Sequence, residues 1–124
     1  MNEKNIPDFW GNCKVVSQLG LESVADIVSK NIFGGIPFIY GKHSIWEEVP
    51  SMYIESNIFG LFIIIGGYGG HEGYDINIQP YGDFNRYLYS NNIKTSRIRL
   101  DTYLYYLLKE GLKNYPEIEI IESK

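Results

Sequence analysis

The sequence predicts an α+β fold: a mainly antiparallel sheet with N-terminal helices and one C-terminal helix packed on it. The middle of the chain contains short β-rich runs separated by turn residues, and helical apolar spacing is confined to the two ends. With 124 residues, 44% of them hydrophobic, the chain has the length and apolar content of one domain with its own core. No repeat or Ser/Pro-rich linker divides it, so we expect a single domain over residues 1–124.

The first third of the chain is expected to form two helices. Phe9, Cys13 and Val16 recur at near-helical spacing before Gly20, which is a helix-stop residue. A second apolar stripe covers residues 21–32 and is followed by two glycines. Both helices should pack on an apolar surface elsewhere in the domain.

The middle of the chain is expected to form strands. Residues 36–40, 45–49 and 52–54 are short β-rich runs, and residues 58–65 are apolar on both faces, which is typical of a central strand. Residues 74–81 alternate between apolar and polar side chains. Between the last two runs lies a glycine-rich segment, residues 66–73, which is longer than a tight hairpin needs, so we expect a mobile surface loop.

The last third returns to a helical pattern. Leucines from Leu100 to Leu112 form an apolar stripe, although residues 94–100 also alternate well enough to be a strand. Of Tyr103, Tyr105 and Tyr106, at least one must face away from the leucine stripe, and we expect the other two to pack in the core. Residues 116–122 alternate acidic and aliphatic side chains, which predicts a half-exposed terminal strand.

Composition narrows the function classes. The formal charge is −4, which disfavours nucleic-acid binding even though Arg86, Lys94, Arg97 and Arg99 form a small basic cluster. The N-terminus lacks the charge and apolar run of a signal peptide, and the longest uncharged stretch, of 15 residues, is too short to span a bilayer. The single cysteine cannot form an intrachain disulfide. We therefore expect a cytoplasmic protein with no membrane segment.

Motifs for cofactor binding and catalysis are weak. The glycine-rich segment has Glu72 where a dinucleotide motif needs its third glycine, and a strand follows it. His71, Glu72 and Asp75, with the distant His43, lack the paired spacing of a zinc site. Cys13 is expected to be buried. We therefore predict no cofactor, no metal and no enzymatic activity, while a small enzyme using the loop of residues 66–75 remains an alternative.

Charge along the chain is uneven. The 43 residues between Lys42 and Arg86 contain no Lys or Arg and six Asp or Glu, which leaves the flanks with nine acids against eleven bases. Four tyrosines lie in the same span. Aromatic side chains supply contact area and carboxylates attract a cationic partner, so this span favours binding to a basic protein. A solvated acidic face with half-buried tyrosines remains the alternative.

Three features of the chain occur together: the stretch Ile45-Trp-Glu-Glu-Val-Pro50 leading into a buried strand, the stretch Tyr74-Asp-Ile-Asn-Ile-Gln-Pro80, and a Tyr/Leu-rich helix. In these features the chain resembles the small immunity proteins of bacterial contact-dependent growth inhibition systems. The resemblance implies a protein that binds and blocks the C-terminal toxin domain delivered by a neighbouring cell. That domain is often a nuclease, and we expect one of the RNase type.

The acidic side chains and tyrosines of the span between Lys42 and Arg86 predict a set of contact residues for the role that the resemblance implies. Six side chains are expected to bind the basic toxin domain: Glu47, Glu48, Tyr68, Glu72, Tyr74 and Asp75. We expect a monomer before complex formation. A generic interaction domain, for example a homodimer formed through residues 117–122, is a third possibility, because a free strand edge can add to another sheet.

Overall fold

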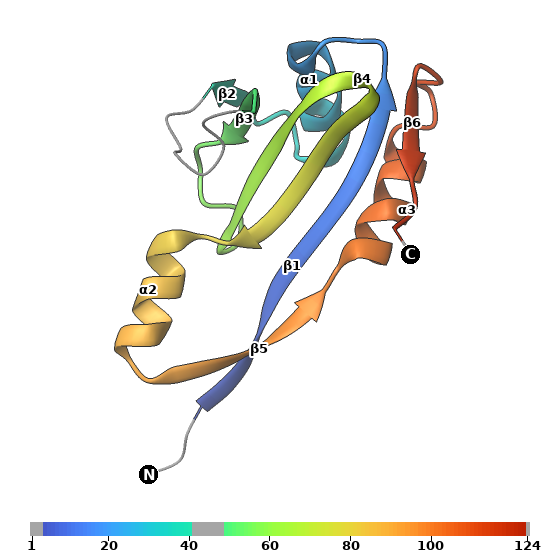
Figure 1. The fold of residues 1–124 in the computed structure, drawn as a ribbon. Coiled ribbons are helices and arrows are strands. Elements are labelled where there is room, and N and C mark those ends of the chain that lie inside the picture. Colours follow the sequence, from blue (N-terminus) through green and yellow to red (C-terminus); the bar gives the residue numbers. More distant parts are fainter. Residues whose placement is uncertain (1–3, 41–48, 124) are drawn as a thin grey trace.

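The computed structural model describes residues 4–40 and 49–123 (Figure 1). The elements in chain order are β1 (Lys4–Ser17), α1 (Leu21–Ile32), β2 (Phe38–Tyr40), β3 (Ser51–Ile54), β4 (Leu61–Pro80), α2 (Gly82–Ser90), β5 (Ile93–Arg99), α3 (Asp101–Gly111) and β6 (Ile118–Ile121). The strands form one sheet in the order β2-β3-β4-β1-β5, and β6 also pairs with β1. All these pairs are antiparallel except β1 with β5, so the predicted α+β class with a mainly antiparallel sheet is confirmed.

The long strand β4 folds back on itself as a hairpin with two arms (Figure 1). Its first arm pairs with β3 and its second arm pairs with β1. Gly67 and Gly73 let the arms approach closely: a Cβ on Gly67 would come 2.4 Å from the carbonyl oxygen of Gly73, and both glycines have positive φ. The expected loop over residues 66–73 is therefore part of the strand, which corrects the prediction of a long mobile connection.

The core lies between the sheet and the two helices α1 and α3. From the sheet it takes alternate residues of β1 and β4, including Cys13, Val15, Ile63 and Ile65, and the leucines of α3 pack against them. Residues 62–66 are buried throughout, as expected for a central strand. The burial of this apolar surface supplies most of the driving force for folding.

The first expected helix is a strand. β1 runs from Lys4 to Ser17, and its buried residues from Gly11 onward alternate with partly exposed ones, as a strand with one face on the core requires. Since Gly11 and Ser17 contribute little hydrophobicity to the buried face, the period of two is hard to see in the sequence. The second expected helix is confirmed as α1.

The C-terminal predictions hold in most respects. The leucine stripe forms α3, residues 118–121 form β6, and residues 93–99 form β5. Tyr103 and Tyr106 are exposed and only Tyr105 packs against the core, so one tyrosine rather than two is internal. The helix α2 was not predicted, and the predicted strand over residues 45–49 lies almost entirely outside the described residues.

Candidate protein-interaction surface

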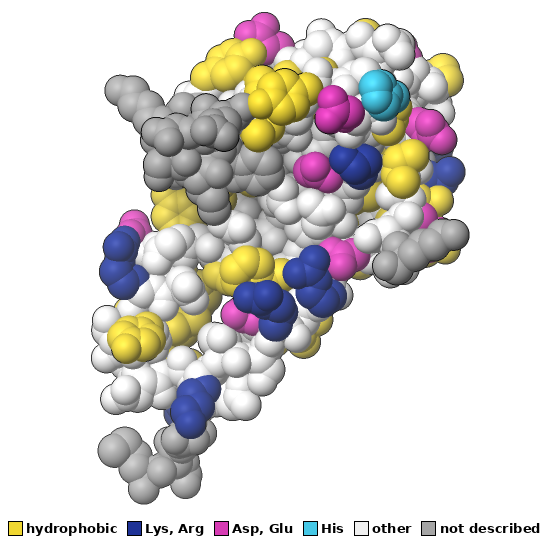
Figure 2. Space-filling model, in the orientation of Figure 1, with side chains coloured by type: hydrophobic (Ala, Val, Ile, Leu, Met, Phe, Trp, Pro, Cys, Tyr) yellow, Lys and Arg dark blue, Asp and Glu magenta, His cyan; other side chains and the backbone are white. Residues whose placement is uncertain are grey.

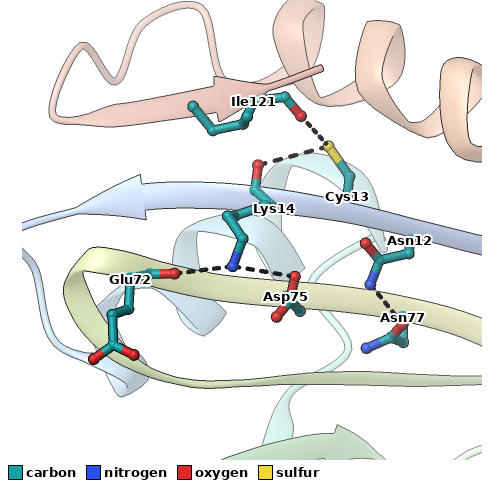
Figure 3. Close-up of polar contacts among 7 residues, drawn as sticks. All are labelled: Asn12, Cys13, Lys14, Glu72, Asp75, Asn77 and Ile121. Atoms are coloured by element: carbon teal, nitrogen blue, oxygen red, sulfur yellow. Dashed lines mark hydrogen bonds and ion pairs between the residues drawn. The ribbon is translucent and has the colours of Figure 1, made fainter. Parts of the chain in front are cut away.

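The residues of β1 and β4 that point away from the core form a polar face. Lys14 from β1 reaches across to β4, where its Nζ donates to the carbonyl oxygen of Glu72 at 2.9 Å and lies 3.5 Å from the Asp75 carboxylate (Figure 3). The next cross-strand pair on the same face is Asn12 with Asn77, in which Asn12 Nδ2 donates to Asn77 Oδ1 at 2.7 Å. The antiparallel register produces these contacts, because it places Lys14 opposite Asp75 and Asn12 opposite Asn77.

The six predicted contact residues occupy different environments. Glu47 and Glu48 lie outside the described residues. Tyr68 and Glu72 are exposed near the tip of the β4 hairpin, and Asp75 is partly exposed beside Lys14. Lys14 thus lies between the Asp75 carboxylate and the backbone carbonyl of Glu72, whose own carboxylate points away from it (Figure 3).

Tyr74 has a core role, which corrects the expectation of a surface contact. Its side chain is only 4% exposed and its hydroxyl donates to the carbonyl oxygen of Leu19 at 2.8 Å. The alternation predicted for this strand explains the outcome, since Tyr74 shares the buried face with Ile76. Burial raises the pKa of the Tyr74 hydroxyl.

Among the described residues, the acidic side chains do not form a surface that is negatively charged throughout, because basic side chains lie between them. Asp75 is beside Lys14, and Asp83 forms an ion pair with Arg86 one helical turn away in α2. Figure 2 shows Lys and Arg side chains interspersed with Asp and Glu over the visible face. The long acidic segment of the sequence is therefore partly neutralised by Lys14, which the strand pairing brings to it, and by Arg86, which follows it directly in the chain.

An aromatic pocket of about 570 Å³ lies where β4 runs into α2. Its lining includes Trp10, Tyr53, Glu55, Phe62, Gln79, Tyr81 and Asp83. The Phe62 ring packs against two of these rings: its centroid lies 5.7 Å from the ring centroid of Tyr53 and 6.3 Å from that of Tyr81. The Arg97 guanidinium carbon lies 3.9 Å from the centroid of Trp10, a cation–π contact. The basic cluster of the sequence is thus partly engaged with this aromatic group.

A strained turn at the start of β4 presents an exposed aromatic ring. Ile58 and Leu61 exchange two backbone hydrogen bonds around Phe59 and Gly60, which have φ values of 52° and 79°. Positive φ at both central residues is typical of a type I′ turn, which favours Asn, Asp or Gly at the first position. Phe59 is 92% exposed, so this residue carries both backbone strain and an exposed apolar side chain.

A second pocket, of about 510 Å³, lies beside that turn. We name it the Phe59 pocket; its lining includes Ile6, Asp8, Phe9, Asn57, Phe59, Leu61, Phe84 and Leu88. Apolar side chains dominate this lining, and Phe84 is 40% exposed. Sequence reasoning missed this surface, although the turn-like stretch Asn57-Ile-Phe-Gly60, with a bulky Phe inside it, was a visible signal.

The described residues contain no group of three or more His, Cys, Asp or Glu side chains placed to hold a metal ion. Cys13 is 1% exposed, and burial, with smaller contributions from Asp101 and Asp75, raises the pKa of its thiol to about 11. Such a thiol is almost fully protonated at neutral pH and is a poor nucleophile. Within residues 4–40 and 49–123, no helix is both long enough and apolar enough to cross a membrane.

Comparison with known proteins gives no match: no family model fits the chain, and neither a curated protein nor a solved structure is significantly similar to it.

Proposed function

We propose that this chain is an immunity-type protein that binds the C-terminal toxin domain of a contact-dependent growth inhibition effector and blocks it. The observation that carries the proposal is the Phe59 turn. A fully exposed Phe in a backbone conformation that disfavours it lowers the stability of the free protein, and contact with a partner compensates for the exposed ring. Large aromatic side chains are the commonest anchors of protein interfaces.

The proposed contact surface runs along β4. Phe59 precedes its first arm, while Tyr68 and Glu72 lie near the tip of the hairpin. At ~3.3 Å per residue, one arm of the β4 hairpin is roughly 25 Å long, which is comparable to the width of a standard protein–protein interface. A single partner can therefore contact both ends, with aromatic anchors supplying affinity and charged side chains supplying orientation.

In this proposal the chemistry is occlusion. A nuclease that grips phosphate groups carries Lys and Arg around its active site, and carboxylates such as Glu55 and Glu72 complement those charges. The toxin is proposed to be a nuclease of the RNase type. The immunity protein acts in the cytoplasm and is monomeric until it meets the toxin.

A binding and protection assay tests the function. The partner to use is the C-terminal domain of a large secreted protein encoded beside this chain, produced in cells with and without it. We expect growth arrest by the toxin domain alone, rescue on co-expression, and a stable complex that elutes as one species in size-exclusion chromatography. A purified candidate domain that neither binds this chain nor loses activity in its presence would overturn the proposal for that pair. Neighbouring genes that encode no secreted protein would overturn the class.

A further inference from the structure

The aromatic pocket where β4 runs into α2 is negatively charged. Its described lining contains two carboxylates, those of Glu55 and Asp83, and no Lys or Arg. Four rings form much of its walls: Trp10, Tyr53, Phe62 and Tyr81. A hollow of about 570 Å³ with aromatic walls and a few polar groups has the make-up of a ligand-binding site. Its charge favours a cation as the ligand and disfavours an anion.

The two carboxylates of the pocket differ in their partners. Asp83 forms an ion pair with Arg86 in α2, so its charge is largely balanced. Glu55 directly follows β3 and is exposed. With the described residues it forms neither an ion pair nor a hydrogen bond. Glu55 is therefore the carboxylate that an incoming cation can reach and pair with.

The rings of the pocket supply a second attraction for a cation, because the faces of aromatic rings are electron-rich. The Phe62 ring is inclined by 39° to the ring of Tyr53 and by 65° to that of Tyr81, so the three rings do not cover one another as a parallel stack. The fourth ring, Trp10, already holds the guanidinium of Arg97 at 3.9 Å from its centroid. One ring of this group thus binds a guanidinium that the chain itself supplies.

An arginine side chain fits this combination of groups best. A metal ion needs several ligands together, and the described residues contain no group of three or more His, Cys, Asp or Glu placed to hold one. A wholly apolar side chain would gain nothing from Glu55. Arginine packs its stem and its planar guanidinium against rings, and its forked donors bind a carboxylate through two hydrogen bonds. The ammonium of lysine is more strongly hydrated and loses more on leaving water.

We propose that the aromatic pocket binds an arginine side chain of the partner protein, with Glu55 as the group that receives the guanidinium and Tyr53, Phe62 and Tyr81 as walls. The backbone N–H of Tyr81 donates to the carbonyl oxygen of Gly60 at 2.8 Å, so the pocket adjoins the Phe59 turn. That the arginine belongs to the toxin domain rests on the proposed function above. The preference for a guanidinium rests on the lining of the pocket alone.

The test uses the isolated chain and two small probes. N-acetyl-arginine amide and its neutral isostere N-acetyl-citrulline amide are titrated into the isotopically labelled full-length chain, and the ring signals of Tyr53 and Tyr81 are followed by NMR. We expect saturable shifts for the arginine probe, with a dissociation constant in the millimolar range, and about 10-fold weaker binding of the citrulline probe. High salt should weaken only the arginine probe, because salt screens the attraction to Glu55. Equal binding of the two probes, or shifts that do not saturate, would overturn the proposal.

A pair of matched variants assigns the preference to Glu55. Glu55→Gln keeps the size of the side chain and removes its charge, and should weaken the arginine probe about 5-fold while leaving the citrulline probe unchanged. Glu119→Gln makes the same change at an exposed position of β6 outside the described lining, and should change neither. If Glu55→Gln binds the arginine probe as tightly as the unmodified chain, Glu55 does not receive the guanidinium and the proposal fails.

A further variant tests the walls. Tyr81→Leu replaces a ring by an apolar side chain, and should weaken the arginine probe more than the citrulline probe, since only the cation gains from the ring face. An equal loss for both probes would mean that Tyr81 contributes apolar surface alone, which contradicts its proposed role.

The two proposals fail separately. A chain that neutralises a toxin domain but shows no preference for arginine over citrulline retains the proposed function and loses the arginine site. A chain that binds the arginine probe through Glu55 but neutralises no candidate toxin retains the site, and the arginine then comes from a different partner.

Discussion

Lys14 and Asp75 face each other across β1 and β4, with the lysine Nζ 3.5 Å from the carboxylate. They are 61 positions apart in the sequence, and the strand register alone brings them together. The contact places a positive charge inside the polar face, next to the backbone of Glu72. It follows that the charge of this face depends on which strands pair and not only on the acidic segment of the chain.

Replacement of Lys14 by Met should make the polar face more negative with little effect on folding. The ion pair is partly exposed, so its loss changes the free energy of unfolding by less than ~1 kcal/mol. Association with a basic toxin domain should become faster, and more strongly so at low salt. Stopped-flow association rates at two ionic strengths measure this effect, and an unchanged or slower rate would contradict the assignment of this face to the interface.

Phe59→Asn should stabilise the free protein and weaken its complex. Asn tolerates positive φ and suits the first position of a type I′ turn, so we expect a gain of about 1 kcal/mol in urea unfolding. The loss of an exposed aromatic anchor should cost the complex about 2 kcal/mol or more. Phe59→Ala is the matched control, because it removes the ring without relieving the turn to the same degree. An Asn variant less stable than the Ala variant would argue against strain at this position.

Tyr74→Phe should destabilise the fold without altering partner binding. The substitution removes the hydroxyl that bonds the Leu19 carbonyl and leaves that acceptor unpaired, at a cost of about 1 kcal/mol. Tyr103→Phe, at an exposed position on α3, should change stability by less than ~0.5 kcal/mol. Chemical denaturation of both variants tests the core role, which fails if the two substitutions have equal effects.

Stability should fall between pH 9 and pH 11 partly through Cys13. The folded state raises the thiol pKa from 9.0 to about 11 and so holds its proton more tightly than the unfolded chain does. The resulting contribution is fully present below pH 9 and is lost as the pH rises through 11, at about 1.4 kcal/mol per unit of pKa. Unfolding curves of the unmodified chain and of Cys13→Ala separate this effect from the titration of Tyr and Lys, which both proteins share. Parallel pH profiles would contradict it.

Much of the fold can be predicted from local patterns. The second arm of β4 alternates strictly, so the burial of Tyr74 and Ile76 on one side follows from the sequence. The helix α3 has a leucine stripe long enough to define its buried side. In both elements, side-chain spacing and burial agree.

Prediction fails where the buried face lacks large apolar residues. β1 buries Gly11 and Ser17 together with Cys13 and Val15, so apolar spacing alone suggests a helix in its place. Only one side chain of α2, Leu88, is buried, which leaves the helix without a recognisable stripe. The parallel pairing of β1 and β5 depends on contacts distant in sequence, which no local pattern records.

The candidate surface was the least predictable part. Counting charges along the chain identifies acidic positions but does not show that Lys14 lies beside one of them, Asp75. Phe59 reads as part of an apolar strand in the sequence, whereas the structure places it at an exposed turn just before β4. The exposure of the Phe59 side chain can be recognised only once the turn that holds this residue is known.

The affinity of a candidate toxin domain for this chain and for its Phe59→Asn variant, measured by isothermal titration calorimetry, tests whether the interface lies at the Phe59 turn. We expect tight binding by the unmodified chain and at least ~30-fold weaker binding by the variant, which corresponds to the loss of a central anchor of about 2 kcal/mol. The variant should fold at least as stably as the unmodified chain. Equal affinity of the two proteins would contradict the placement of the interface at the Phe59 turn.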